Sequence, residues 1–172
     1  MSQQQRDDRR RPVLLALGAN LGDPAAQLRR ALGELGGVLT SLRVSSLYRT
    51  APVGYLDQPD FYNLVCSGET RLGPRELLRE MQHIEAALGR TRPFANAPRT
   101  LDIDLLAYGD LLLETPELTL PHPRLHERGF VLVPLVEIAP DWRHPRLGRT
   151  ARELLQALGP TQGVERVGRS EG

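Results

Sequence analysis

Two aspartates, Asp102 and Asp104, stand two residues apart in the apolar stretch TLDIDLLAY. On a β-strand this spacing places both side chains on one face, roughly 6.5 Å apart along the strand. Such a pair can hold one or two hard cations, and Mg²⁺ combines one or two carboxylates with waters and substrate phosphates. An ordinary half-exposed strand is the alternative, but aspartate is depleted in strands and like charges repel, so the pair favours a metal site.

Three arginines, Arg90, Arg92 and Arg99, precede the aspartates in a segment that contains two prolines and few apolar residues. A solvated surface loop is one interpretation. A polyphosphate chelated to Mg²⁺ would explain both groups, because the metal would bind the aspartates and the phosphate oxygens would bind the guanidinium groups. Phosphoryl-type transfer needs mainly positioning and charge neutralisation from a protein, so the pattern indicates that chemistry.

His122 and His126 have the spacing of a pair of metal ligands on a helix, but Pro121 and Pro123 disfavour a helix there. We expect instead a single histidine that donates a hydrogen bond near the phosphates. Cys66 is the single cysteine and lies in an apolar run, so we expect it to be a small core residue and not a nucleophile.

The composition limits the classes of partner. The chain has 172 residues, about one domain, and its 22 basic residues, all arginine, nearly balance 21 acidic residues to a net charge of +1. This balance argues against nucleic acid or an anionic membrane as a partner. The absence of lysine excludes a Walker-type phosphate lysine and a Schiff-base lysine.

The chain is expected to comprise a disordered tail over 1–11, one domain over 12–160 and a loose C-terminus over 161–172. The polar N-terminus lacks the apolar region of a secretory signal, no apolar run reaches about 18 residues, and the lone cysteine fits a reducing compartment. We therefore expect a cytoplasmic protein that spans no membrane, and a monomer.

The order of elements predicts the fold. Apolar periodicity and breakers indicate a strand at 12–18 that is buried on both faces, a helix capped by Asp23, an alternating strand within 38–50, a strand at 61–70, a helix at 73–89 and a strand at 100–108. Gly18 and Gly22 are expected to be turn residues. This βαββαβ order predicts an α+β, ferredoxin-like sandwich, an antiparallel sheet with helices on one face, followed by an irregular helical C-terminal part.

With these residues in view, the sequence resembles the 6-hydroxymethyl-7,8-dihydropterin pyrophosphokinases of folate biosynthesis over residues 13–145. The matching segments include LGANLG, SSLYRTAPVG, DQPDFYN, PRTLDIDLL and LTLPHPRLHERGFVLVPL. The resemblance implies an enzyme that moves pyrophosphate from ATP to the hydroxymethyl group of the pterin, with release of AMP. It also implies two Mg²⁺ ions as cofactors.

The resemblance assigns roles to individual residues. It implies that the catalytic groups are Arg90, Arg99 and the metal ligands Asp102 and Asp104. It implies ATP contacts from Gln82, Glu85, Arg90, Arg92, Arg99, Thr119, His122 and Arg128, with Glu85 either at the nucleotide or behind the residues that contact it. It implies pterin contacts from Thr50, Pro52, Val53, Gly54, Phe61, Asn63, Asp102 and Phe130, with the Asn63 amide at the edge of the heterocycle and the Phe130 ring on its face. The sequence departs from the family pattern at Phe61, Pro93, Asn96 and Pro123.

Two alternatives remain open at this stage. A Mg²⁺-dependent nucleotide hydrolase would use the same aspartates with water as the acceptor. A ferredoxin-like RNA-binding module is the other alternative, although the chain lacks the basic face and the paired aromatic motifs of such modules, with only 5% aromatic residues.

Overall fold

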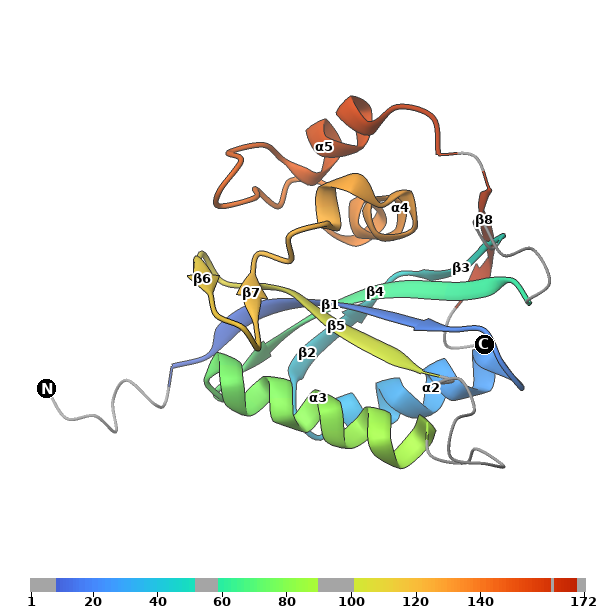
Figure 1. Cartoon of the computed structure of the whole chain (residues 1–172), viewed down its shortest axis with the longest axis horizontal. Helices are drawn as coiled ribbons and strands as arrows, with labels where there is room; N and C mark the ends of the chain where they lie inside the picture. The colour runs from blue at the N-terminus through green and yellow to red at the C-terminus, as the bar shows by residue number, and fades with distance from the viewer. Residues whose placement is uncertain (1–8, 52–58, 90–100, 162, 170–172) are drawn as a thin grey trace, which may run out of the picture.

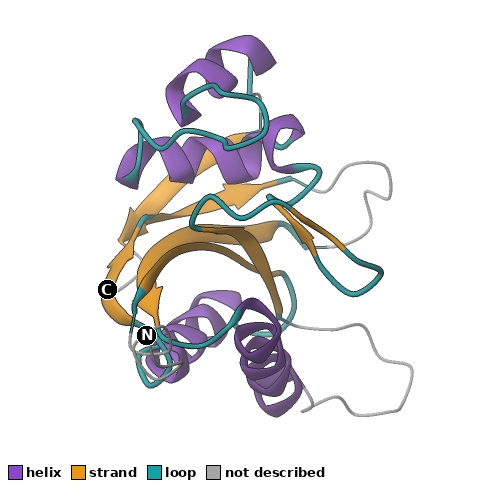
Figure 2. Cartoon of the chain, turned by 90° about the vertical axis from the view of Figure 1, so that its left-hand side faces the viewer, coloured by secondary structure: helices purple, strands orange, loops and turns teal. Residues whose placement is uncertain are grey.

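The computed structural model describes residues 9–51, 59–89, 101–161 and 163–169. A central sheet lies between two layers of helices (Figure 1). The turned view shows the sheet edge-on between the layers (Figure 2). Below, the layer beneath the sheet in Figure 1 is called the lower layer, and the layer above it the upper layer.

The sheet is antiparallel between all paired strands. The strand order is β5-β1-β4-β3-β8, and β2 also pairs with β4. This arrangement confirms the predicted α+β, ferredoxin-like sandwich. The strands are β1 (Arg11–Ala19), β2 (Thr40–Val44), β3 (Ser46–Thr50), β4 (Phe61–Thr70), β5 (Asp102–Tyr108) and β8 (Val164–Arg169).

The lower layer consists of α2 (Pro24–Leu35) and α3 (Pro74–Gly89), which begin and end where the sequence predicts. The side chain of Asp23 accepts a hydrogen bond from the backbone N–H of Ala26, at 3.2 Å, and thus caps the first helix. Apolar residues of both helices pack against the sheet in one buried cluster, and these include Leu28, Leu32, Leu35, Leu77, Met81 and Ile84.

The upper layer consists of α4 (Gly129–Ile138) and α5 (Ala151–Leu158), preceded by a short 3₁₀ helix, η1 (Leu125–Glu127). The helical C-terminal part is present as predicted, and α2 and α3 share one face as expected, but α4 and α5 cover the other face, so helices are not confined to one face of the sheet. A second buried cluster joins these helices to the sheet through residues such as Leu14 and Val65. Thr150 and Glu153 form a capping box at the start of α5.

The expected strand within 38–50 is broken at Ser45 into β2 and β3. Ser45 is buried, and its hydroxyl accepts a hydrogen bond of 3.0 Å from a backbone N–H of β4. The break shifts the alternation by one residue, so that Leu47 joins Leu42 and Val44 at the lower core, whereas Tyr48 faces α4. The single alternating strand expected from the sequence would have placed Leu42, Val44 and Tyr48 on one face.

The C-terminal part holds more structure than predicted. Residues 161–172 were expected to be loose, yet Val164–Arg169 form β8, which pairs with β3. An edge strand can be held by backbone hydrogen bonds with mostly exposed side chains, so it lacks an apolar pattern. A two-stranded sheet, β6 (Leu113–Glu114) and β7 (Thr119–Leu120), was also not predicted. Most of the expected N-terminal tail lies outside the described residues.

No helix in the described part of the chain is long and apolar enough to cross a membrane.

Candidate active site

A row of four paired residues crosses the upper face of the sheet, beside the beginning of α4. Tyr48 of β3 pairs with Asn63 of β4, Asn63 pairs with Gly18 of β1, and Gly18 pairs with Asp102 of β5. Their chain neighbours, such as Leu17 and Leu64, point into the lower core. The four positions therefore face the upper side of the sheet. Gly18, expected in a turn, lies within a strand.

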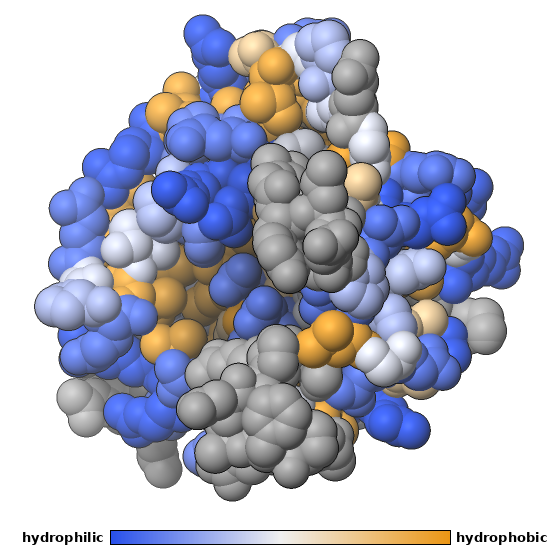
Figure 3. Space-filling model, turned by 45° about the vertical axis from the view of Figure 1, so that its right-hand side comes forward, coloured by the Kyte–Doolittle hydropathy of each residue, from blue (hydrophilic) through white to orange (hydrophobic). Residues whose placement is uncertain are grey.

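A cavity of about 470 Å³ opens above this row. It is lined by strand residues and by the beginning of α4, namely Ala16–Asn20, Thr50, Ala51, Phe61, Asn63, Leu64, Asp102, Asp104, Arg128, Phe130 and Val131. Figure 3, which brings this end of the molecule forward, shows apolar side chains inside a hollow rimmed by polar residues. The cavity thus combines an apolar interior with a few polar groups, as small-molecule sites do.

Asp102 and Asp104 are both exposed on β5, whereas Leu101, Ile103 and Leu105 are buried. The predicted alternation is confirmed, and both carboxylates line the cavity. Among the described residues there is no group of three or more potential metal-ligating side chains. A pair of accessible carboxylates fits Mg²⁺, which takes its remaining ligands from waters and phosphates.

Glu85 of α3 positions the aspartate strand. Its Oε2 accepts a hydrogen bond of 2.8 Å from the backbone N–H of Ile103, the residue between the two aspartates. Because β5 is an edge strand that pairs only with β1, this side chain supplies an acceptor where a further strand would otherwise stand. The family resemblance implied that Glu85 lies either at the nucleotide or behind the residues that contact it, without this bond to β5. A carboxylate on the apolar side of an amphipathic helix is the signal that could have revealed the second role.

Asn63 has an oriented carboxamide. Its side chain is buried, and its Nδ2 donates a hydrogen bond of 3.3 Å to the hydroxyl of Thr50. Phe61 lies two residues earlier on β4 and lines the same cavity. The structure therefore brings together three of the residues that the resemblance assigns to the pterin.

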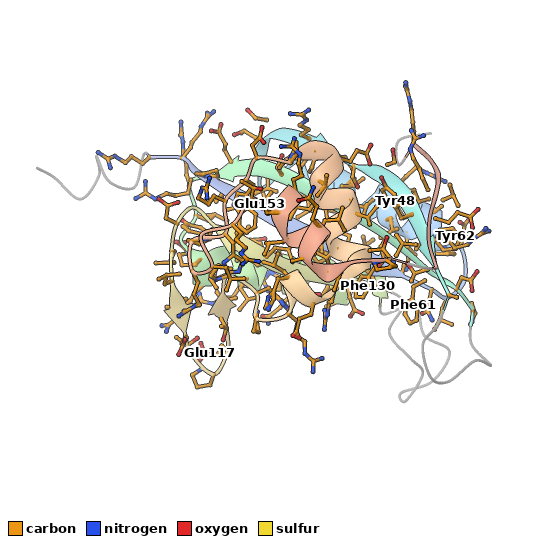
Figure 4. All side chains as sticks on the ribbon, turned by 90° about the horizontal axis from the view of Figure 1, so that it is seen from above. Tyr48, Phe61, Tyr62, Glu117, Phe130 and Glu153 are labelled. Atoms are coloured by element: carbon orange, nitrogen blue, oxygen red, sulfur yellow. The ribbon has the colours of Figure 1, made fainter. Side chains whose placement is uncertain are left out.

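The aromatic ring of Phe130 lies at the beginning of α4. Figure 4, a view from above the upper layer, places it near Phe61 at one end of the sheet, and both rings line the cavity. The guanidinium carbon of Arg128 lies 5.5 Å from the centroid of the Phe130 ring, within cation–π range. Among the described residues that line this cavity, Arg128 is the one with a positive charge, in contrast to the negative charges of Asp102 and Asp104.

A second cavity, of about 280 Å³, lies on the other side of Asp104. Its lining includes Thr119, His122, Pro123 and Glu117, and it shares Asp104 with the first cavity. Two residues expected at the nucleotide, Thr119 and His122, therefore lie together. Asp104 stands between them and the residues expected at the pterin.

His122 is arranged as a neutral hydrogen-bond donor. Its Nδ1 accepts a hydrogen bond of 3.1 Å from the backbone N–H of Arg124, so the proton of the neutral ring lies on Nε2. Burial lowers the pKa of His122, and the charges of Arg128 and Arg124 lower it further, while Asp104 acts in the opposite direction. A neutral imidazole that donates through Nε2 suits a phosphate oxygen.

Several expected residues lie elsewhere. Gln82 is exposed on α3 and lines neither of these cavities. The ring of His126 lies 6.3 Å from that of His144, in an edge-on arrangement. Cys66 is fully buried in the lower core, as predicted, and burial raises the pKa of its thiol to about 12. Outside the described residues lie Pro52, Val53, Gly54, Arg90, Arg92 and Arg99.

The chain is similar to known proteins along most of its length. Residues 14–140 match the family model of 7,8-dihydro-6-hydroxymethylpterin-pyrophosphokinase. The 2-amino-4-hydroxy-6-hydroxymethyldihydropteridine pyrophosphokinase of Pseudomonas aeruginosa is 43% identical over 157 residues, which cover 90% of this chain and 96% of that protein. The Bacillus subtilis protein of the same name is 48% identical over 126 residues, covering 72% and 75% of the two chains.

Other relatives are much longer. The folic acid synthesis protein fol1 of Schizosaccharomyces pombe is 43% identical over 152 residues, which cover 87% of this chain but only 21% of that protein. The crystal structure of wild-type Plasmodium falciparum HPPK-DHPS matches with a TM-score of 0.71 and 17% identity, over 90% of this chain and 46% of that chain. The structural match supports the fold.

These findings define the class of protein as a pyrophosphokinase, an ATP-dependent diphosphotransferase. The chain belongs to the 7,8-dihydro-6-hydroxymethylpterin-pyrophosphokinase family. The enzyme class and the family expected from the sequence are confirmed. Neither alternative, the nucleotide hydrolase or the RNA-binding module, gains support from the relatives.

Proposed function

We propose that this chain transfers pyrophosphate from ATP to the hydroxymethyl group of 6-hydroxymethyl-7,8-dihydropterin, with release of AMP, in folate biosynthesis. The observation that carries the proposal is the family match over residues 14–140, which includes both aspartates and both cavities. Relatives that this chain nearly spans are named for this reaction.

The cavity above Gly18 would hold the pterin. The carboxamide of Asn63 offers a donor and an acceptor to the edge of a heterocycle, and its orientation is held by Thr50. The Phe130 ring would stack on the face of the heterocycle, and Phe61 would complete the apolar wall. The family resemblance assigns further contacts to Pro52, Val53 and Gly54.

The second cavity, with Thr119 and His122, would hold ATP, so that its phosphates extend past Asp104 toward the pterin. His122 would donate through Nε2 to a phosphate oxygen, and Arg128 would supply positive charge at the rim of the pterin cavity. Asp102 and Asp104 would hold two Mg²⁺ ions. When bound, Mg²⁺ neutralises phosphate charge and aligns the phosphate oxygens.

In the chemical step the hydroxymethyl oxygen attacks the β-phosphorus of ATP. The bond from that phosphorus to the oxygen bridging to the α-phosphate breaks, and AMP leaves with this oxygen, while the hydroxyl proton is lost. The β- and γ-phosphates remain on the pterin. Arg90 and Arg99 would act as the catalytic cations, and Arg92 and Gln82 would contact ATP. Closure of the protein over both substrates would exclude water from the site and so suppress the hydrolysis of ATP.

The protein is further proposed to act as a monomer in the cytoplasm. The single cysteine is buried and forms no disulfide, which fits a reducing compartment, and the net charge of +1 gives no general attraction to nucleic acid or anionic lipid. Light scattering of the purified protein, at several concentrations, measures the oligomeric state.

The decisive experiment measures AMP release from ATP and Mg²⁺ with and without 6-hydroxymethyl-7,8-dihydropterin. Release of AMP only in the presence of the pterin is the expected result, with one AMP formed for each pterin pyrophosphate. Equal release without the pterin would identify a hydrolase and overturn the proposal. The 6-methyl analogue of the dihydropterin, which lacks the hydroxyl group, serves as a control, since it can bind but cannot accept the pyrophosphoryl group.

A further inference from the structure

Gly18 leaves a gap in the row of side chains beneath the pterin cavity. It pairs with Asn63 on one side and with Asp102 on the other. Adjacent strands lie about 4.8 Å apart, so the Asn63 and Asp102 backbones are separated by roughly 9.6 Å, and β1 contributes no side chain between them. A slot therefore lies between the carboxamide and the carboxylate, and Gly18 forms its floor.

The backbone does not require a glycine at this position. Gly18 lies inside β1, and its φ is outside the left-handed range, in contrast to Gly22, which has a φ of +66°. Glycine inside a strand weakens the strand, because it loses more conformational freedom on folding and offers no side chain to pack. A strand glycine with ordinary φ often marks a place where a ligand approaches the backbone closely.

A side chain at position 18 would disturb one neighbour in particular. A Cβ added to Gly18 would lie 2.9 Å from Oδ1 of Asn63, closer than real Cβ contacts, and its next nearest neighbour would be 3.8 Å away. Asn63 is 8% exposed and is bonded to Thr50, so its carboxamide has little room to turn. A methyl group would therefore misorient the amide without disrupting the core.

Another strand glycine shows the contrast. A Cβ on Gly68 of β4 would lie 3.2 Å from both the Leu39 side chain and the Thr40 backbone oxygen. That glycine is required by the packing of the protein itself. At Gly18, by contrast, the space that a Cβ would enter is part of the cavity and borders the Asn63 carboxamide.

We propose that Gly18 is a specificity-determining residue for the pterin. Its missing side chain admits the ring to the slot between Asn63 and Asp102, and it leaves the Asn63 amide in the orientation in which the amide can hydrogen-bond the edge of the heterocycle. This role rests on the proposed function. It concerns recognition of the pterin alone, because the second cavity, which would hold ATP, does not include Gly18.

The test compares Gly18→Ala with wild type by fluorescence titration of the oxidised analogue 6-hydroxymethylpterin, in the presence of Mg²⁺ and a non-hydrolysable ATP analogue. Pterin affinity and the pterin KM should worsen by roughly 10- to 200-fold, the effect of one methylene in a tight pocket. The ATP analogue should bind as it does to wild type, and Tm should be preserved. Gly33→Ala is the matched control, since nothing lies within 4 Å of a Cβ there.

A double-variant cycle separates the two parts of the role. Asn63→Ala removes the carboxamide, so adding Gly18→Ala to it should worsen pterin affinity much less than in wild type. An undiminished effect in that background would contradict the role of Gly18 in orienting the Asn63 amide. An equal loss of ATP affinity, or a failure of Gly18→Ala to fold, would overturn the proposal as a whole. If wild type itself bound no pterin, the proposed function would be wrong. If wild type bound the pterin and Gly18→Ala bound it equally well, only the role of Gly18 would be wrong.

Discussion

The carboxylate of Glu85 on α3 accepts a hydrogen bond from the backbone N–H of Ile103 on β5, and the two atoms lie 2.8 Å apart. Ile103 points into the lower core between Asp102 and Asp104, which point the opposite way. One helix side chain therefore fixes the strand segment from which both aspartates project. The geometry of the proposed metal site would therefore depend on a residue that does not line the proposed pterin cavity.

Glu85→Ala should reduce kcat/KM for Mg·ATP by about tenfold, because a hydrogen bond to a charged group contributes about 1.5–3 kcal/mol. Glu85→Gln keeps an acceptor and should lose less. Steady-state kinetics over a range of Mg²⁺ concentrations measure the effect, and part of it should be recovered at high Mg²⁺. Glu80→Ala, exposed on the same helix, is the control. Wild-type kinetics in Glu85→Ala would show that the bond does not position the aspartates.

Asp102→Asn and Asp104→Asn keep the side-chain shape and remove the charge. Turnover should fall by on the order of 100-fold or more at saturating Mg²⁺, since removal of one electrostatic group at a reacting centre has effects of this size. The two variants should differ in binding, because Asp104 lines both cavities and Asp102 lines only the pterin cavity. Calorimetric titration with an ATP analogue should thus show a larger loss for Asp104→Asn.

Asp110→Asn is the control for both aspartate variants, because Asp110 is an exposed residue that follows β5 and lies in neither cavity. Near-normal turnover in Asp102→Asn or Asp104→Asn would remove that residue from the metal site.

Phe130→Leu keeps an apolar side chain at the start of α4 and removes the aromatic face. The pterin KM should rise several-fold, because aromatic stacking contributes about 0.5–1.5 kcal/mol beyond burial. The KM for ATP should change little. Val133→Ala, one turn further along the same helix, is the control for helix packing. If both KM values rose together in Phe130→Leu, the ring would serve the shape of the site as a whole and not the pterin.

Local sequence signals predicted most of the lower half of the molecule. Asp23 and Pro24 mark the start of α2, and the Asp102 and Asp104 alternation gives the correct face of β5. These signals are local because capping and alternation depend on neighbours in the chain. The helical C-terminal part was predicted, but its position on the second face of the sheet was not, although the apolar run of β1 predicted burial on both faces, because no local pattern states which segment covers a face.

Other features depend on contacts that are distant in the sequence. The break at Ser45 is stabilised by a backbone N–H of β4, and it decides that Tyr48 faces α4. Gly18 was expected in a turn because glycine is common there; its pairing with Asn63 and Asp102 emerges only when three strands are aligned. Position within the sheet, and not residue type, distinguishes a turn glycine from one that leaves room for a ligand.

Glu137 near the end of α4 ties the upper layer to β3, and this tie should make stability depend on pH. Its Oε1 accepts hydrogen bonds from the Ser46 N–H at 2.9 Å and from the Tyr48 hydroxyl at 2.7 Å, and its Oε2 accepts one from the Ser46 hydroxyl at 2.7 Å. Burial by itself would raise the pKa of Glu137, but these hydrogen bonds and the charge of Arg166 outweigh burial and hold the pKa below its usual value.

A carboxylate whose pKa is lower in the folded than in the unfolded state stabilises the fold above its unfolded pKa, near 4.5, and loses this contribution as the pH falls through its folded pKa. The Tm of Glu137→Gln should therefore lie below that of wild type at neutral pH, and the difference should shrink below about pH 4.5. Each kcal/mol lost lowers Tm by roughly 2–4 °C in a domain of this size. Glu34→Gln, an exposed change on α2, should follow wild type at every pH. A Tm difference for Glu137→Gln that is constant with pH would mean that the charge of Glu137 does not hold α4 on the sheet.

Because α4 carries Phe130 at its other end, loosening of α4 in Glu137→Gln should also raise the pterin KM at neutral pH. An unchanged pterin KM in this variant would mean that the hydrogen bonds of Glu137 serve stability alone.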